Sequence, residues 1–379
     1  MGLYRRLVLL ALLLTAVVVV FGAYVRLADA GLGCPDWPGC YGQLSPAHAA
    51  DDIRAAHAAD PHGPVSLPKA WKEMVHRYLA ATLGLLIIAI AVLAWRRRSE
   101  PGSAPGVATV LVGVVIFQGL LGKWTVTLLL KPAIVTAHLL GGLTTLALLT
   151  WLALRAFAAP QRQANLAVDA SAPLRLAAAA GFVLLVGQIA LGGWTSTNYA
   201  ALACTDFPAC HGSYWPEADY ANAFHVVREL GMTADGELLS LAALTAIHWT
   251  HRLGALVAGG FLLVLGAALM RRPGSRDAGI ALLGALALQV GLGIANVLLS
   301  LPLPLAVAHN AGAALLVGVM VWVNFTLACT RSLPFKGRVG VGMGSNQHTD
   351  HPIPLPTSPL KGEEQTAALA ALSSNLQEA

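Results

Sequence analysis

Long apolar stretches alternate with short polar segments along the 379 residues of the chain. A helix that crosses a membrane needs about 20 mostly apolar residues, because each residue adds roughly 1.5 Å of rise. The first stretch is expected to be a retained helix and not a secretory signal, because it is long and lacks a clear small-residue cleavage site. Eight stretches reach membrane-spanning length, approximately Leu7–Leu27, Met74–Trp95, Val107–Leu130, Ala133–Leu154, Leu174–Thr197, Leu241–Met270, Ile280–Ser300 and Leu305–Cys329.

The composition supports a membrane protein. Apolar residues make up 56% of the chain and charged residues 11%, whereas a soluble domain carries about 25% charged residues. The mean hydropathy is +0.65. We therefore predict an all-α integral membrane protein surrounded by lipid, and exclude a soluble enzyme. The net charge of +5 does not indicate nucleic-acid binding, because the basic residues stand in short clusters between apolar stretches, where membrane topology explains them.

Clusters of basic residues predict the orientation of the helices. Lys and Arg concentrate on the cytoplasmic side of membrane proteins. We therefore expect both termini in the cytoplasm of a bacterial-type plasma membrane, with long loops at about 28–72 and 198–240 on the outer side. The basic residues that lead to this prediction are Arg5, Arg6, Arg96, Arg97, Arg98, Arg155, Arg162, Arg175, Arg271, Arg272, Arg276, Arg331, Lys336 and Arg338.

The two halves of the chain resemble each other. A C-x-D-aromatic-P-x-C-x-G pattern at 34–42 recurs at 204–212. Further matches are His76-Arg77 with His251-Arg252, and Gln118 and His138 with Gln289 and His309, where the glutamine and the histidine have the same separation in both halves. Because each half holds four spans, both halves have the same orientation. We predict two four-helix bundles related by a pseudo-two-fold axis along the membrane normal.

This repeat divides the chain into three predicted parts. Residues 1–165 form an N-terminal four-helix half, and residues 166–330 form a C-terminal four-helix half. Residues 331–379 are rich in Gly, Pro, Ser and Thr and show no apolar period. We expect them to form a disordered cytoplasmic tail.

Histidines inside the spans are the main candidate site. Ionisable side chains at membrane depth are costly and often functional, although a single one can simply form an interhelical hydrogen bond. Two histidines on neighbouring helices can bind a heme iron from both sides, whereas zinc requires about four close ligands. The candidate axial pairs are His76 with His138 and His251 with His309.

Other polar residues lie beside these histidines. Arg77 and Arg252 each follow a candidate ligand, and their guanidinium groups are suited to bind heme propionates, or alternatively to reach lipid headgroups. Gln118 and Gln289 are interpreted as hydrogen-bonding within the bundle, with a bound ligand as the alternative.

The two halves differ at one informative position. Glu73 lies three residues before His76, on the same helix face, whereas His248 stands three residues before His251. A carboxylate beside one site suggests a reacting heme there and an electron-transfer heme in the other half. Alternatively, Glu73 only forms an ion pair with a nearby lysine or with Arg77. A separate alternative is that His248 replaces His251 as the ligand.

Four cysteines lie in the two long loops as two closely spaced pairs. Cysteines outside the cytoplasm normally form disulfides, and a turn containing proline can bring two Cα atoms within roughly 4.4–6.8 Å. We expect the disulfides Cys34–Cys40 and Cys204–Cys210. They are interpreted as structural, with thiol exchange as the alternative.

These features together resemble the heme A synthase family over most of residues 1 to 330. The matching segments are Glu73-Met-Val-His76-Arg77, Thr136-Ala-His138-Leu-Leu, His251-Arg252, His309-Asn310 and the loop from Gly31 to Cys40. The resemblance implies oxidation of a methyl group of heme O to the formyl group of heme A, which terminal oxidases use.

The resemblance also implies roles for individual residues. His251 and His309 would ligate a resident heme b. His76 and His138 would flank the substrate heme O, with Glu73 taking part in the reaction. The implied partner is the prenyltransferase that makes heme O, and a homo-oligomer is allowed.

Two other classes of protein compete with this interpretation. A membrane cytochrome b that moves electrons between quinone and extracytoplasmic thiols would use the same four histidines without needing Glu73. A transporter would use the repeat to carry a solute across the membrane. A heme-prenylating enzyme is disfavoured, because the chain lacks paired aspartate motifs for magnesium-bound diphosphate.

Overall fold

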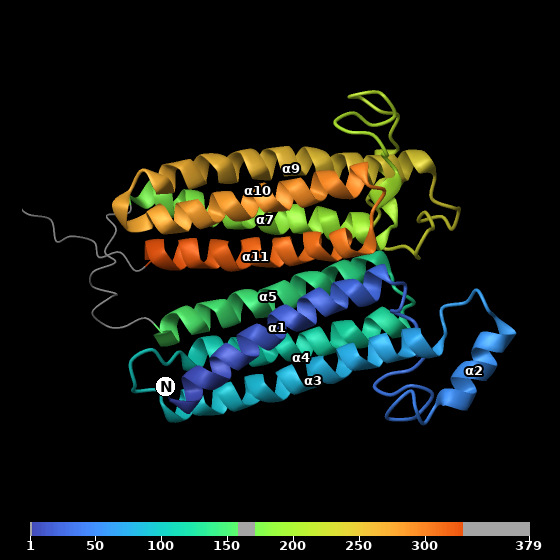
Figure 1. The fold of residues 1–379 in the computed structure, drawn as a ribbon, viewed down its shortest axis with the longest axis horizontal. Coiled ribbons are helices and arrows are strands. Elements are labelled where there is room, and N and C mark those ends of the chain that lie inside the picture. Colours follow the sequence, from blue (N-terminus) through green and yellow to red (C-terminus); the bar gives the residue numbers. More distant parts are fainter. Residues whose placement is uncertain (1, 158–170, 329–379) are drawn as a thin grey trace, which may run out of the picture. The chain divides into compact units, whose positions relative to one another are not determined.

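The computed structural model describes residues 2–157 and 171–328. In this part of the chain all regular elements are helical, and eight helices are long and apolar enough to cross a membrane, which confirms the predicted fold class. They are α1 (Leu3–Leu27), α3 (Leu67–Arg96), α4 (Pro105–Thr127), α5 (Pro132–Phe157), α7 (Ala172–Thr197), α9 (Leu241–Met270), α10 (Arg276–Leu298) and α11 (Leu303–Ala328) (Figure 1).

Some helices extend beyond the apolar stretches that predict them. Helix α3 begins at Leu67, about two turns before Met74. Ser66 is extended and Pro68 lies in the first turn, an arrangement that starts a helix readily. Glu73 and His76 therefore both lie well inside α3. The loops also contain short helical elements that the apolar pattern does not predict: α2 (Ala50–Ala59), η1 (Ala200–Leu202), α8 (Tyr220–Ala223) and η2 (Pro273–Ser275).

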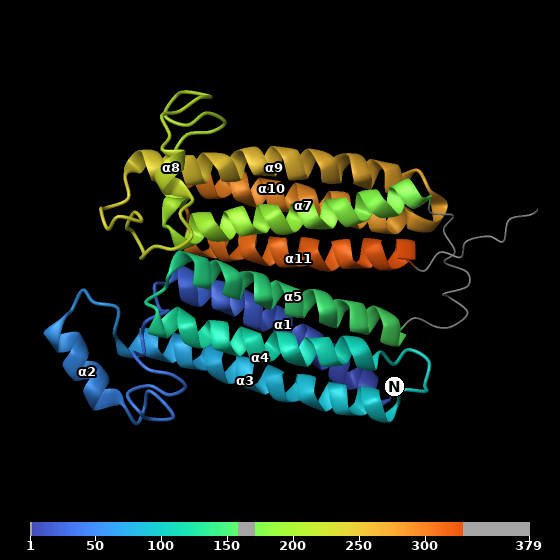
Figure 2. The same cartoon turned by 180° about the vertical axis from the view of Figure 1, so that it is seen from behind.

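Each half forms a bundle of four helices. In the first half, α1 and α4 both pack against α3 and α5. In the second half, α7 and α10 both pack against α9 and α11. Figures 1 and 2 show the two groups from opposite sides. The apolar core of the first half includes Val8, Ile87, Leu111 and Leu149, one from each of its helices.

The two halves meet through four helices. Helix α5 contacts α7 and α11, and α11 also contacts α1. If α1 corresponds to α7 and α5 to α11, exchanging the halves leaves this set of contacts unchanged. Such a contact pattern is what a two-fold relationship produces, although the axis itself stays a prediction.

Backbone conformation also repeats between the halves. Non-glycine residues rarely adopt positive φ. In the described part of the chain, the non-glycine residues with positive φ form four pairs. The two members of each pair are separated by nearly the same number of residues as the two cysteine patterns. The pairs are Asp29 and Tyr199, Tyr41 and His211, Leu129 and Ser300, and Leu130 and Leu301. The similarity found in the sequence therefore extends to the turns that connect the helices.

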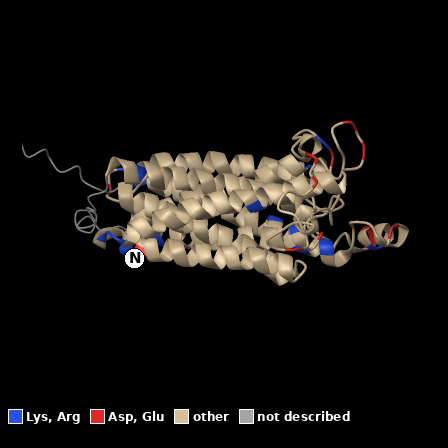
Figure 3. Cartoon of the chain, turned by 90° about the horizontal axis from the view of Figure 1, so that it is seen from above, with Lys and Arg blue, Asp and Glu red and all other residues tan. Residues whose placement is uncertain are grey.

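Charged residues gather toward the two ends of the helices (Figure 3). We call the end that carries the segments 28–66 and 198–240 the loop end. Its placement outside the cytoplasm remains a prediction. The predicted boundary at 165/166 and the predicted tail at 331–379 lie outside the described residues.

Candidate functional site

A cavity of about 1760 Å³ runs through the interior of both bundles. Small-molecule pockets usually measure roughly 300–1,000 Å³, so this cavity has room for more than one large ligand. Its walls are mostly apolar. The lining includes all the predicted site residues of the helices: Glu73, His76, Arg77, His138, His251, Arg252 and His309.

Each of the four candidate histidines lies against a glycine of a neighbouring helix. A Cβ atom on that glycine would lie only 2.8–3.3 Å from the imidazole Cε1 atom. The missing side chain therefore leaves the space that each ring occupies. The pairs are Gly22 with His76, Gly122 with His138, Gly192 with His251 and Gly293 with His309. The sequence carried this signal, because these glycines recur between the halves at nearly the same spacing as the cysteine patterns.

Each of these histidines has a ring nitrogen that forms no hydrogen bond with the described residues. The Nδ1 atoms of His76, His138 and His309 are buried without a hydrogen-bond partner. In His251, Nδ1 lies 3.0 Å from the Gln188 amide nitrogen. Each imidazole thus keeps at least one free ring nitrogen among the described residues. Buried polar groups are normally paired, so imidazoles with an unpaired ring nitrogen on the cavity lining fit the role of heme iron ligands.

No group of three or more His, Cys, Asp or Glu residues that could hold a metal ion occurs in the described part of the chain. A structural zinc site usually needs four ligands. Pairs of histidines without further donors therefore suit heme better than a bare zinc ion.

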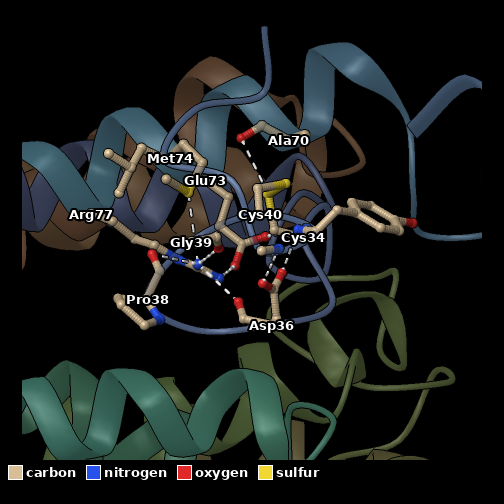
Figure 4. The surroundings of a disulfide bond; sticks show 12 residues. Cys34, Asp36, Pro38, Gly39, Cys40, Ala70, Glu73, Met74 and Arg77 are labelled. Atoms are coloured by element: carbon tan, nitrogen blue, oxygen red, sulfur yellow. Dashed lines mark hydrogen bonds and ion pairs between the residues drawn. A yellow bond between two sulfur atoms is a disulfide. The ribbon is translucent and has the colours of Figure 1, made fainter. Parts of the chain in front are cut away.

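Glu73 joins helix α3 to the first disulfide loop (Figure 4). Its carboxylate accepts a hydrogen bond from the Cys34 N–H group at 3.0 Å and forms an ion pair with Arg77. Arg77 in turn donates to the carbonyl oxygens of Asp36 at 2.9 Å and Gly39 at 2.5 Å. The glutamate is only 4% exposed. The structure thus contains the ion pair between Glu73 and Arg77 that the sequence suggested as an alternative role for Glu73.

The second half builds the same connection with a different side chain. His248, also 4% exposed, has its Nδ1 atom 3.3 Å from the Cys204 N–H group and its Nε2 atom 3.3 Å from Arg252 Nε. A neutral imidazole accepts at only one nitrogen, so it satisfies one of these two donors at a time. His248 thus occupies the place of Glu73 and contacts the loop.

Both predicted arginines hold the disulfide loops. Arg252 donates to the carbonyl oxygens of Asp206 and Ala209, each at 2.8 Å, and of Cys204 at 2.9 Å. Arg77 donates to the corresponding oxygens of Asp36 and Gly39, and its other terminal nitrogen pairs with Glu73. Their proposed contact with heme propionates stays a prediction.

The structure contains both expected disulfides, Cys34–Cys40 and Cys204–Cys210, each with a Cα–Cα distance of 4.9 Å. All four cysteines are fully buried. Thiol exchange requires access of an attacking thiolate to a sulfur atom. Burial therefore favours the interpretation that the disulfides are structural.

Aspartates complete the two loops. Asp36 accepts hydrogen bonds from Tyr41 N–H at 2.6 Å and Gly42 N–H at 2.7 Å. Asp206 accepts equivalent bonds from His211 and Gly212, both at 2.8 Å. The bond from Gly212 is the main cause that lowers the pKa of Asp206. Because that pKa lies below its ordinary value, the bonds persist at neutral pH and are lost only as the pH falls through it.

A cluster that the sequence pattern does not predict connects the halves at the loop end. Arg26 donates to the Tyr199 hydroxyl at 3.0 Å and to the Ser196 carbonyl oxygen at 3.1 Å. Tyr199 donates to Asp29 at 2.9 Å. Burial raises the pKa of Tyr199, and nearby Arg26 opposes that shift.

These features define an integral membrane protein built from two similar four-helix halves, with four histidines facing an interior cavity. The family model described as cytochrome oxidase assembly protein matches residues 5–321. Heme A synthase of Shewanella oneidensis is 42% identical over 84% of this chain and 94% of its own length. The chain belongs to the heme A synthase family of cytochrome oxidase assembly proteins.

Other relatives agree with this assignment. Heme A synthase of Shouchella clausii is 30% identical over 65% of this chain and 75% of its own length. The enzyme of Sphingopyxis alaskensis is 30% identical over 81% of this chain and 87% of its own length. The predicted family is confirmed, and the electron-carrier alternative is not favoured.

Proposed function

We propose that the chain converts heme O to heme A by oxidising a methyl group to a formyl group. Two hydroxylations followed by loss of water achieve this four-electron change, and an oxidant from outside the chain must take up the four electrons. The observation that carries the proposal is an apolar cavity lined by four imidazoles, three of which have a buried Nδ1 atom without a hydrogen-bond partner among the described residues. Family membership supplies the substrate.

We assign different hemes to the two halves. His251 and His309 hold a resident heme b in residues 166–330, and His76 and His138 flank heme O in residues 1–165. Glu73 supports this division, because the equivalent side chain in the C-terminal half is His248. Bound heme supplies the oxidative chemistry, as cofactors generally do.

The residues of the chain would provide positioning and proton transfer. The imidazoles fix the macrocycles, and the apolar walls exclude water from them. Glu73 lines the cavity and is the carboxylate placed to hold or move a proton at Oε1 or Oε2. The loop end would face away from the cytoplasm, and a heme O-producing prenyltransferase would supply the substrate.

Substitution of Glu73 tests the proposal. Glu73→Gln keeps an oxygen that accepts the Cys34 N–H hydrogen bond but removes the charge. Glu73→His introduces the residue type that the other half has at the equivalent position, His248. If Glu73 has a chemical role, both variants retain heme b and produce at least about tenfold less heme A, since general acid–base groups contribute typically 10²–10⁴-fold.

The measurement is mass analysis of hemes extracted from the purified full-length protein and from the membranes that express it. His248→Gln is the matched control, because it alters the equivalent loop contact without touching Glu73. Normal heme A formation by Glu73→Gln would contradict the assigned role of Glu73.

A further inference from the structure

Three glutamine amides lie against three of the four candidate histidines. Gln118 Nε2 donates to the His138 carbonyl oxygen at 2.7 Å. Gln188 Nε2 donates to the His251 carbonyl oxygen at 3.0 Å. Gln289 Nε2 lies 3.3 Å from His309 Nε2. In each case the glutamine comes from the helix that also supplies the glycine beneath the imidazole.

A second glycine makes each contact possible. It lies three residues after the histidine, where a Cβ atom would come within 2.1–2.3 Å of the glutamine Oε1 atom. Any larger residue would displace the amide. The three combinations of glutamine, histidine and glycine are Gln118–His138–Gly141, Gln188–His251–Gly254 and Gln289–His309–Gly312. We call each combination an amide clamp.

The fourth histidine has no amide clamp. Every clamp glutamine lies four residues before the glycine beneath the ring, and the residue four before Gly22 is Val18. The residue three after His76 is Leu79, where the other three histidines have glycine. Both parts of the clamp are therefore replaced together by branched apolar residues. Val18 lines the cavity and packs against the apolar core of the first half.

The clamps also differ between the halves in what they contact. In the C-terminal half, the Gln188 and Gln289 amides each reach an imidazole nitrogen, at 3.0 and 3.3 Å. In the N-terminal half, Gln118 contacts only the backbone of His138. Gln188 meets Nδ1 of His251 and Gln289 meets Nε2 of His309, so in each ring the other nitrogen stays unpaired among the described residues.

We infer that the amide clamps position His138, His251 and His309, and that unclamped His76 is the ligand that releases when substrate enters and product leaves. This inference rests on the proposed function and assigns Gln118, Gln188 and Gln289 as positioning residues. A ring held before binding loses less conformational freedom when a ligand binds. The clamped C-terminal pair therefore suits a resident heme, and the half that contains His76 suits a heme that must exchange.

Exchanging the patterns between the halves tests the inference. Gln188→Val with Gly254→Leu removes one clamp, and Val18→Gln with Leu79→Gly installs one at His76. Gln188→Leu alone removes the amide without crowding Gly254, which keeps the test valid if the first double variant does not fold. The protein is the full chain purified with bound heme, and the probe is transfer of heme to excess apomyoglobin.

The expected changes have opposite signs. Removing the Gln188 amide should speed loss of heme b about tenfold, which equals about 1.4 kcal/mol, and should alter the optical and EPR spectrum of that heme. Installing the clamp at His76 should slow release of heme O and heme A by a similar factor and raise the amount that copurifies.

Unchanged dissociation rates and spectra in these variants, with heme A still produced, would overturn the inference and leave the proposed function intact. Wild-type protein that contains no heme would overturn the proposed function itself.

Discussion

The two halves share a scaffold and differ at the groups closest to the candidate hemes. Both have a buried disulfide loop, an arginine that binds loop carbonyl oxygens, and imidazoles lying on glycines. They differ where Glu73 is matched by His248 and where Val18 and Leu79 are matched by Gln188 and Gly254. Shared features maintain the fold of each half, so the differences are where two separate functions can arise.

Histidine substitutions should give the largest effect. His251→Leu or His309→Leu should remove nearly all heme b, because each deletes an iron ligand from the resident site. His76→Leu or His138→Leu should keep heme b and abolish heme A formation. Heme content per protein, measured from the absorbance of the extracted pyridine complexes, reports both outcomes.

His57→Leu is the control for these variants, because His57 is exposed on α2 and is not among the residues that line the cavity. Equal loss of heme b from variants of both halves would refute the division of roles between them.

Loss of the first disulfide should have an intermediate effect. Cys34→Ser with Cys40→Ser should lower the stability of the protein by about 2 kcal/mol, the loop-closure value for such a short loop. Activity should persist below the melting temperature, because Arg77 and Asp36 also hold the loop. Thermal unfolding and heme A formation are the measurements.

The corresponding variant, Cys204→Ser with Cys210→Ser, should behave similarly. Complete loss of activity at unchanged stability in either variant would instead indicate a disulfide that takes part in redox chemistry.

The smallest effect should come from the glycines beneath the rings. A Cβ at Gly192 would lie 3.0 Å from His251 Cε1, and one at Gly22 would lie 2.8 Å from His76 Cε1. Overpacking costs about 1–3 kcal/mol, and alanine in a helix recovers up to about 1 kcal/mol. The net change in the free energy of unfolding should thus be small for both alanine variants. Gly192→Ala should still perturb the optical spectrum of its heme more than Gly22→Ala does, because the Gln188 contact limits how far His251 can move.

Gly187→Ala is the matched control on α7, because a Cβ there meets no atom within 4 Å. A larger perturbation by Gly22→Ala than by Gly192→Ala would argue against a held ring in the C-terminal half.

The membrane-spanning helices could be predicted from the sequence because the length of each apolar stretch is enough to define a span. Their ends were harder to predict. Helix α3 extends to Leu67 through the polar residues Lys69, Lys72 and Glu73, which an apolar criterion excludes. Polarity also concealed α2, whose first turn carries Asp51 and Asp52.

The candidate site was predicted in its residues but less in its contacts. The repeat was sufficient to select His76, His138, His251 and His309. The binding of Arg77 and Arg252 to loop carbonyl oxygens was not predictable, because it depends on how each loop folds back over its helix. The amide clamps did leave a signal, a glutamine four residues before one glycine and a histidine three before another, which appears three times.

The central claim is that this cavity holds heme and oxidises heme O. The most direct measurement is to express the full chain with and without a supply of heme O, purify it, and identify the extracted porphyrins by mass. The account predicts heme b in both preparations and heme A only when heme O is supplied. Protein that contains no porphyrin in either preparation, or heme O that is bound but never converted, would contradict it.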